Sequence, residues 1–196
     1  MTTVWKGLRV ARIGITGHTN LSAATVPLVA DGIRAALAGC PTAELVGVSC
    51  LARGADQVFA RIVLDLGGRL DVVLPAADYR QRQVAADNTA EFDELLGRAT
   101  SVHTMPFPVS GEQAYMAAGE HVLAGVDALV AVWDGGPSGG YGGTADVVAA
   151  ARQRGLAVTV VWPERAARSW FPAQGRSVPR RPTGRRAPGR ARPGPG

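Results

Sequence analysis

Apolar residues are arranged in two alternating patterns along the chain. Short runs rich in valine, isoleucine and leucine predict strands that are buried on both faces. These runs cover residues 8–16, 44–49, 70–74, 101–107, 128–133 and 156–162. Longer segments between them place apolar residues at helical spacing and end at glycine or proline. The predicted helices cover residues 25–38, 54–66, 78–99 with a break near Asn88, 111–125 and 144–154.

Regular alternation of strands and helices predicts an α/β fold with a mostly parallel sheet of about six strands. Right-handed crossovers leave few topologies, and we expect a Rossmann-like, doubly wound order that reverses beside the first strand. In such sheets, ligands bind at the reversal, outside the carboxyl ends of the strands.

One loop at that edge is unusually rich in glycine. The apolar run 128–133 leads to Asp134, and six of the next nine residues are glycine. A helix follows, with Thr144 as its expected N-cap. Glycine lets the backbone approach a ligand closely, and a helix N-terminus adds partial positive charge. The loop therefore predicts an anion site, although a flexible surface connection would have a similar composition.

Two further loops should meet at the same edge. Gly17 allows a tight turn, and His18 can bond phosphate, transfer a proton or bond local backbone. Arg53 and Gly54 precede a helix and can face an anion. Asp134 can accept ribose hydroxyls or bond the backbone of its own loop. The predicted ligand-binding residues are Gly17, His18, Arg53, Gly54, Asp134, Gly135, Gly136, Ser138, Gly139, Gly140, Gly142, Gly143 and Thr144.

Several common motifs are absent. No Gly-Lys-Ser/Thr follows the glycine loop, and no GxGxxG follows the first strand, which disfavours a P-loop NTPase or a dinucleotide enzyme. There is no His/Cys cluster. Cys40 and Cys50 make neither a disulfide framework nor a metal set. We therefore predict neither a metal nor a cofactor.

Charge divides the chain into two parts. Residues 1–163 carry 12 basic and 15 acidic residues, whereas residues 164–196 carry nine arginines and one glutamate. The net charge of +5 thus belongs to an Arg/Pro/Gly-rich tail, which is expected to be disordered because it has little to bury. Such a tail either binds nucleic acid nonspecifically or is a solvated appendage. We predict a folded domain over 1–163.

No apolar run reaches the roughly 18 residues that cross a bilayer, and the start lacks a signal-peptide pattern. We expect a cytoplasmic protein without a membrane partner.

The motifs resemble the SLOG superfamily, which unites the DNA-processing protein DprA/Smf with the Lonely Guy (LOG) phosphoribohydrolases. The segment 49–56, Ser-Cys-Leu-Ala-Arg-Gly-Ala-Asp, resembles the SG-x-A-x-GID segment of DprA, and 14–18 resembles its first turn. Residues 127–146 resemble the glycine loop of LOG enzymes. The resemblance covers about residues 8–162 and implies a nucleotide-binding Rossmann-like domain that is commonly dimeric.

Two departures from LOG enzymes bear on catalysis. Val147 stands where their catalytic Glu belongs, and the position of their Arg falls near Ala118. We therefore expect a domain that binds a nucleotide or nucleotide-derived ligand, as a sensor rather than a catalyst. One alternative is a phosphoribohydrolase-like enzyme that cleaves an N-glycosidic bond with Asp134, Asp146 or Glu120. Another is a DprA-like protein that binds nucleic acid through its arginine-rich tail.

Overall fold

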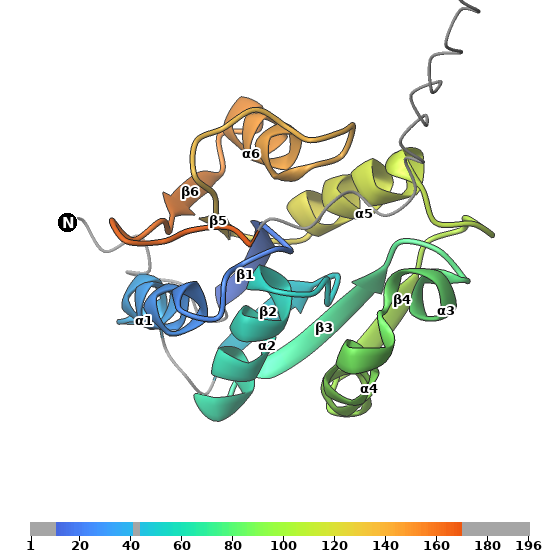
Figure 1. Cartoon of the computed structure of the whole chain (residues 1–196), viewed down its shortest axis with the longest axis horizontal. Coiled ribbons are helices and arrows are strands. Elements are labelled where there is room, and N and C mark those ends of the chain that lie inside the picture. The colour runs from blue at the N-terminus through green and yellow to red at the C-terminus, as the bar shows by residue number, and fades with distance from the viewer. Residues whose placement is uncertain (1–10, 41–43, 170–196) are drawn as a thin grey trace, which may run out of the picture.

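The computed structural model of the chain describes residues 11–40 and 44–169 (Figure 1). Six strands alternate with helices along this part of the chain. The strands are β1 (Ala11–Gly17), β2 (Leu45–Ser49), β3 (Arg69–Leu74), β4 (Ser101–Thr104), β5 (Ala128–Val132) and β6 (Ala157–Val160). The α-helices are α1 (Thr25–Leu37), α2 (Ala55–Asp65), α3 (Tyr79–Gln83), α4 (Thr89–Gly97), α5 (Glu112–Ala124) and α6 (Thr144–Gln153), with a 3-10 turn, η2 (Ala86–Asn88).

All strand pairs in the sheet are parallel, in the order β4-β3-β2-β1-β5-β6. Strands β2 to β4 are added on one side of β1, and β5 and β6 are added on the other. The order of the strands therefore reverses between β1 and β5, where Gly17 pairs with Val132. This arrangement confirms the predicted Rossmann-like sheet and its reversal beside the first strand. The turn after β1 and the glycine loop after β5 consequently leave the sheet side by side.

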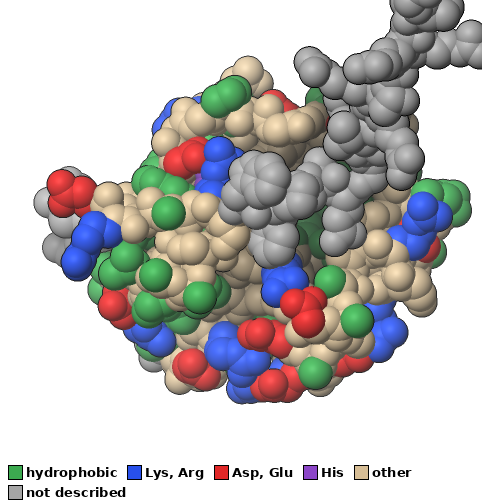
Figure 2. Space-filling model, viewed as in Figure 1, with side chains coloured by type: hydrophobic (Ala, Val, Ile, Leu, Met, Phe, Trp, Pro, Cys, Tyr) green, Lys and Arg blue, Asp and Glu red, His purple; other side chains and the backbone are tan. Residues whose placement is uncertain are grey.

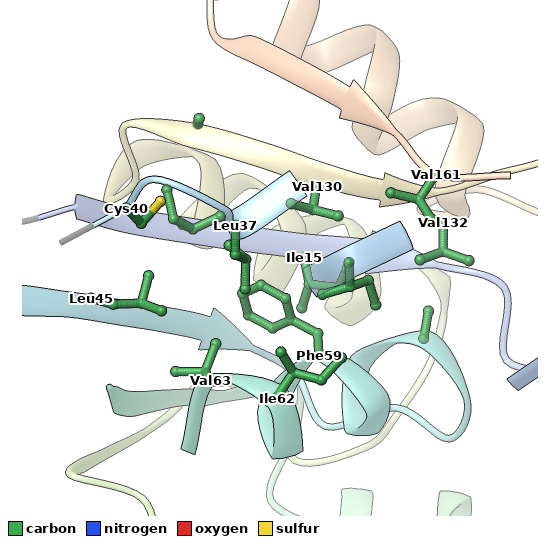
Figure 3. Packing of buried hydrophobic residues seen from close by; sticks show 14 of the residues in the cluster. Ile15, Leu37, Cys40, Leu45, Phe59, Ile62, Val63, Val130, Val132 and Val161 are labelled. Carbon is green, nitrogen blue, oxygen red and sulfur yellow. The ribbon is translucent and has the colours of Figure 1, made fainter. Parts of the chain in front are cut away.

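One face of the sheet is covered by α1, α2 and α4. Aliphatic residues of β1 and β5 meet both α1 and α2, and Phe59 of α2 is fully buried in this cluster (Figure 3). Farther along the sheet, Phe92 of α4 packs on Leu70 and Val72 of β3. The side chains that pack here are apolar positions at helical spacing, as the sequence pattern predicts.

The other face is covered by α5 and α6. Val122 of α5 packs among residues of β2 and β3, while Leu129 of β5 lies in a cluster with Val147 of α6. All five residues of β5 are buried, because helices cover this strand on both sides. That burial confirms the prediction drawn from its unbroken apolar run.

Two element boundaries refine the sequence predictions. Gly143, not Thr144, is the N-cap of α6, and Thr144 is the first helical residue. The helical region 78–99 is broken near Asn88 as predicted, into α3, η2 and α4. Within residues 11–40 and 44–169, no helix is both long enough and apolar enough to cross a membrane.

Residues 164–169 turn back over the sheet and lie against the segment between β1 and α1. The red segment after β6 in Figure 1 follows this path. Leu21 and Arg168 form an antiparallel bridge, and Ser169 N–H donates to Asn20 O at 2.6 Å. The first six residues of the expected tail are therefore held by the domain. The rest of the predicted disordered tail, 170–196, lies outside the described residues.

Candidate functional site

His18 lies at the centre of the carboxyl edge. Its backbone N–H donates to Val132 O at 3.0 Å, which places it where β1 and β5 end. The imidazole is nearly buried and meets the ring of Trp162 edge-on, with 5.4 Å between centroids. Its Nε2 atom lies 3.0 Å from Oδ1 of Asp134. Burial lowers the pKa of His18 and outweighs the opposing effect of Asp134. The ring is therefore mainly neutral at pH 7.

Asp134 joins three parts of the edge through its carboxylate. Oδ1 accepts the N–H of Gly136 at 2.9 Å, and Oδ2 lies 3.1 Å from Nε of Arg168. Burial favours a higher pKa for Asp134, but the bonds from Gly136 and His18 and the charge of Arg168 together lower it. The carboxylate is therefore ionised. Backbone bonding, one of the two roles foreseen for Asp134, is the one present here.

The glycine loop folds back on α5. A Cβ on Gly142 would lie 2.7 Å from the backbone nitrogen of Met116, and one on Gly140 would lie 2.8 Å from a carboxylate oxygen of Glu112. Gly142 also has a φ of +83°, which favours glycine. The loop is fastened internally by Ser138 Oγ, which donates to Gly140 O at 2.6 Å. These contacts account for glycine at positions 140 and 142.

A set of backbone donors remains available around this loop. Within the described residues, no hydrogen bond is made by the N–H groups of four consecutive loop residues or of the first two residues of α6. They are Ser138, Gly139, Gly140, Tyr141, Thr144 and Ala145. Unpaired N–H groups at a helix N-terminus, with the helix dipole behind them, favour a bound anion.

Asp146 occupies part of the same helix start. Its Oδ2 accepts the N–H of Gly142 at 2.9 Å, four residues earlier in the chain. This bond closes the turn that precedes the N-cap Gly143, and it places a negative charge beside the helix dipole. Dipole complementarity and the bond to Gly142 together account for the position of Asp146.

The third predicted loop, 49–54, lies against the turn after β1. Gly54 has a φ of +84°, and a Cβ there would lie 2.7 Å from His18 O. The N–H of Ala55, at the start of α2, donates to the same His18 oxygen at 3.2 Å. Gly17 is equally constrained, with Ala55 Cβ 2.5 Å from a built Cβ. Both glycines thus permit close packing of β1 against α2.

Arg53 is directed away from the glycine loop. Its guanidinium makes a two-point pair with Asp87 of η2, at 3.1 and 2.9 Å. Among the described residues, Arg53 therefore makes no hydrogen bond or ion pair with His18 or Asp134.

A network of buried hydrogen bonds lies under the 49–54 loop and holds its backbone. Oδ2 of Asp56 accepts the hydroxyl of Ser49 at 3.2 Å and the N–H of Cys50 at 3.1 Å. Gln57 and Asn88 exchange two amide hydrogen bonds of 2.9 and 2.8 Å beside it. Burial raises the pKa of Asp56 to about 7 despite these donors. The motif resembling DprA is thus held from inside the domain by the buried carboxyl group of Asp56.

Glu120 is not part of the site. It pairs with Arg154, which follows the last residue of α6, ten residues beyond Thr144. Ten helical residues span about 15 Å, so the pair lies at the opposite end of α6 from the glycine loop. Of the three catalytic candidates, the structure brings only Asp134 and Asp146 to the carboxyl edge.

The N-terminus of α1, the usual phosphate site of a first-strand turn, is filled by the protein itself. Ala167 O accepts the N–H of Ser22 at 3.1 Å and the hydroxyl of Thr25 at 2.8 Å. Thr25 Oγ1 in turn accepts the N–H of Ala167 at 2.8 Å. A backbone carbonyl thus takes the position where an anion would meet α1, whereas the N–H groups of Thr144 and Ala145 at the start of α6 have no partner among the described residues.

Three residues at the edge were not predicted from sequence. Arg168 was assigned to the tail, Trp162 only to a strand, and Glu112 only to a helix. A weak signal for Trp162 is its position at the end of the last apolar run, where parallel strands present residues to the ligand edge. Within the described chain, no group of three or more His, Cys, Asp or Glu residues is arranged to hold a metal ion.

Comparison with known proteins locates the fold. No family profile and no curated protein matches the sequence. Among solved structures, DprA from Streptococcus pneumoniae matches with a TM-score of 0.56 and 16% identity, over 78% of this chain and 50% of that one. DprA from Helicobacter pylori, described as binding single-stranded DNA, matches with a TM-score of 0.55 and 17% identity, over 76% and 64% of the two chains.

A molybdenum cofactor binding protein from Rippkaea orientalis matches with a TM-score of 0.50 and 15% identity, over 79% of this chain and 77% of that one. The chain spans between half and two thirds of the DprA chains that it matches. The chain therefore shares its fold with DprA and with the molybdenum cofactor binding protein, as the resemblance found in the sequence motifs predicts.

Proposed function

We propose that this protein binds a nucleotide or a nucleotide-derived phosphorylated ligand at the carboxyl edge between β1 and β5, and that it acts as a sensor rather than a catalyst. The observation that carries the proposal is the set of N–H groups along residues 138–141 and at the start of α6 that have no partner among residues 11–40 and 44–169. Backbone donors aligned with a helix dipole suit a phosphate group. Solved structures that share the fold include a molybdenum cofactor binding protein, which supports a small-molecule ligand.

The interior of the domain argues against LOG-type cleavage. Ala118 and Val147, at the positions of the LOG catalytic Arg and Glu, are both buried, and Val147 packs beside Gly119 of α5. No catalytic side chain could act from either position without disrupting the core. Asp134 and Asp146 are engaged by backbone N–H groups, which gives each a structural role. These features favour binding without turnover.

The folded part is also poorly suited to nucleic acid. Of the twelve arginines in residues 11–40 and 44–169, nine form ion pairs with carboxylates. On the face seen in Figure 2, basic and acidic side chains are interspersed. A phosphate backbone is bound by unpaired cations, which this surface largely lacks. Affinity for DNA would have to come from residues 170–196.

A charge substitution at Gly139 tests the proposed site. A Cβ at Gly139 meets nothing within 4 Å, so a side chain fits there without a clash. Gly143 is less suitable, because its Cβ would lie 2.2 Å from Ser138 Oγ. We expect Gly139→Glu to lose affinity for AMP, GMP, CMP or UMP, and the matched neutral variant Gly139→Gln to retain most of it.

Binding can be followed through the indole N–H of Trp133. This group donates to Gly136 O at 2.8 Å and therefore reports on the loop in NMR spectra. Mass spectrometry of small molecules that copurify with the protein would identify the natural ligand. Equal binding by Gly139→Glu and wild type would place the ligand elsewhere, and release of free base from any of the four nucleotides would show turnover.

A further inference from the structure

The segment 164–169, here called the strap, reaches the proposed ligand site with a single cation. Arg168 projects from the strap to Asp134, whose other carboxylate oxygen already holds the first turn of the glycine loop. The carboxylate of Asp134 therefore contacts both the guanidinium of Arg168 and Gly136, the second residue of the glycine loop. The strap carries a second arginine, Arg165, which makes no ion pair within the described residues.

The ion pair of Arg168 is an incomplete one. The shortest contact joins Nε to Oδ2 of Asp134 at 3.1 Å, and no hydrogen bond from Nη1 or Nη2 is formed to any described residue. The Arg168 side chain is 46% exposed. An exposed pair with one contact contributes little to stability, whereas a guanidinium binds a phosphate through two parallel N–H bonds. Arg168 thus keeps four N–H donors available beside an anion site.

The backbone of the strap is fixed while this side chain remains free to move. Ser22, Thr25 and Asn20 hold the strap through backbone and side-chain hydrogen bonds to Ala167 and Ser169. A cation on a fixed backbone, bound by one weak contact, loses little conformational freedom when it changes partner. Asp134 would meanwhile keep its bond from Gly136 and its contact with His18.

We propose that Arg168 is the phosphate-binding cation of this site, and that its guanidinium moves from Asp134 to the phosphate group when a phosphorylated ligand enters. This inference rests on the proposed function and extends it to the strap. It also defines the ligand class, because a neutral nucleoside offers no group that would draw Arg168 from Asp134. The carboxylates of Asp134, Asp146 and Glu112 all lie against this loop, so a phosphate bound there needs a compensating positive charge.

The test is a titration of the full-length protein with inorganic phosphate and with AMP, followed by NMR. Wild type is compared with Arg168→Ala and Arg168→Lys, and Arg165→Ala is the matched control for the loss of one positive charge from the strap. The amide of Ser22, which is bonded to Ala167 O, reports in the same spectra whether the strap stays in place.

We expect Arg168→Ala to bind both probes about tenfold more weakly, as for loss of one charge-assisted contact, and Arg165→Ala to match wild type. Arg168→Lys should lie between them. Unchanged binding by Arg168→Ala, or equal weakening by Arg165→Ala, would overturn the role of Arg168. Tighter binding by Arg168→Ala would show instead that the side chain only obstructs the site.

These outcomes separate this inference from the proposed function. If Gly139→Glu weakens binding and Arg168→Ala does not, the ligand binds at the glycine loop and Arg168 does not bind its phosphate. If wild type binds neither probe nor any of the other three nucleotides, both proposals fall together.

Discussion

The Nε2 atom of His18 lies 3.0 Å from the carboxylate oxygen Oδ1 of Asp134 and 3.2 Å from the backbone nitrogen of the same residue. The first contact is favourable when Nε2 carries a hydrogen, and the second when it does not. Because burial lowers the pKa of His18, the neutral ring predominates near pH 7, and its tautomer decides which contact is a hydrogen bond. The pKa of His18 should therefore change when a neighbouring charge is added or removed.

Two substitutions should move the pKa of His18 in opposite directions. Asp134→Asn removes the carboxylate that raises this pKa, so the pKa should fall further. Arg168→Ala removes a positive charge that lowers it, so the pKa should rise. An NMR titration of the His18 ring measures both effects, with Arg165→Ala as the control. Shifts of the same sign would show that neighbouring charge does not govern this histidine.

Asp56 should make stability fall as pH rises. Burial raises the pKa of Asp56 to about 7, against 3.8 as its ordinary value, so the folded protein retains a proton that the unfolded chain has lost between these limits. The free energy of unfolding should therefore decline from pH 4 to pH 7, with a slope approaching about 1.4 kcal/mol per pH unit.

Asp56→Asn isolates this effect, because the amide keeps an acceptor for Ser49 and Cys50 and has no charge to bury. Urea unfolding of wild type and variant at several pH values gives the difference, in which the contribution of His18 cancels. A difference that is independent of pH would mean that the buried carboxyl ionises as easily as in water.

Gly54→Ala should be strongly destabilising. The residue has a φ of +84°, and the new Cβ would lie 2.7 Å from His18 O and 2.9 Å from Thr19 O, both backbone atoms that cannot turn aside. We expect a loss of about 3 kcal/mol or more in the free energy of unfolding, since strain and a backbone clash combine.

Gly67→Ala is the matched control for this glycine. Its φ is +79°, yet a Cβ there meets nothing within 4 Å. Only the cost of the left-handed conformation remains, about 1 kcal/mol. Thermal or urea unfolding compares the two variants. Equal losses would show that conformation alone, and not the close approach of β1 to α2, requires glycine at position 54.

The sequence predicted the sheet and its ligand edge because these depend on local patterns. The unbroken apolar run of β5 and the helical spacing in α2 can each be read within one element. The break near Asn88 was also foreseen, although its partner Gln57 was not. Burial of that amide pair depends on contact between segments 31 residues apart.

The membership of the site was harder to predict, because it depends on side-chain direction. Arg53 lies in the expected loop, but Asp87 of a distant turn holds its guanidinium. Arg168 lies in a segment whose composition indicates disorder, and the backbone bonds that hold it there come from residues 20–25. Neither pairing leaves a periodic signal in the sequence.

Thr25→Val should release the strap. Thr25 is 1% exposed, and its hydroxyl both donates to Ala167 O and accepts from Ala167 N–H. The hydroxyl has one hydrogen, so Ser22 Oγ, 2.8 Å away, must donate to it. Valine keeps the shape but removes all three bonds and leaves Ala167 N–H without its acceptor, which should cost about 1–3 kcal/mol.

Hydrogen exchange shows where that cost appears. The amides of Ser22 and Ser169, bonded to Ala167 O and Asn20 O, should exchange faster in Thr25→Val, while those of β5 remain protected because the sheet does not depend on the strap. Thr89→Val is the control, since its hydroxyl makes one exposed bond to Ala85 O. Continued protection of Ser22 and Ser169 would show that strand β6 alone positions the strap, and that Arg168 stays over Asp134 without the hydroxyl of Thr25.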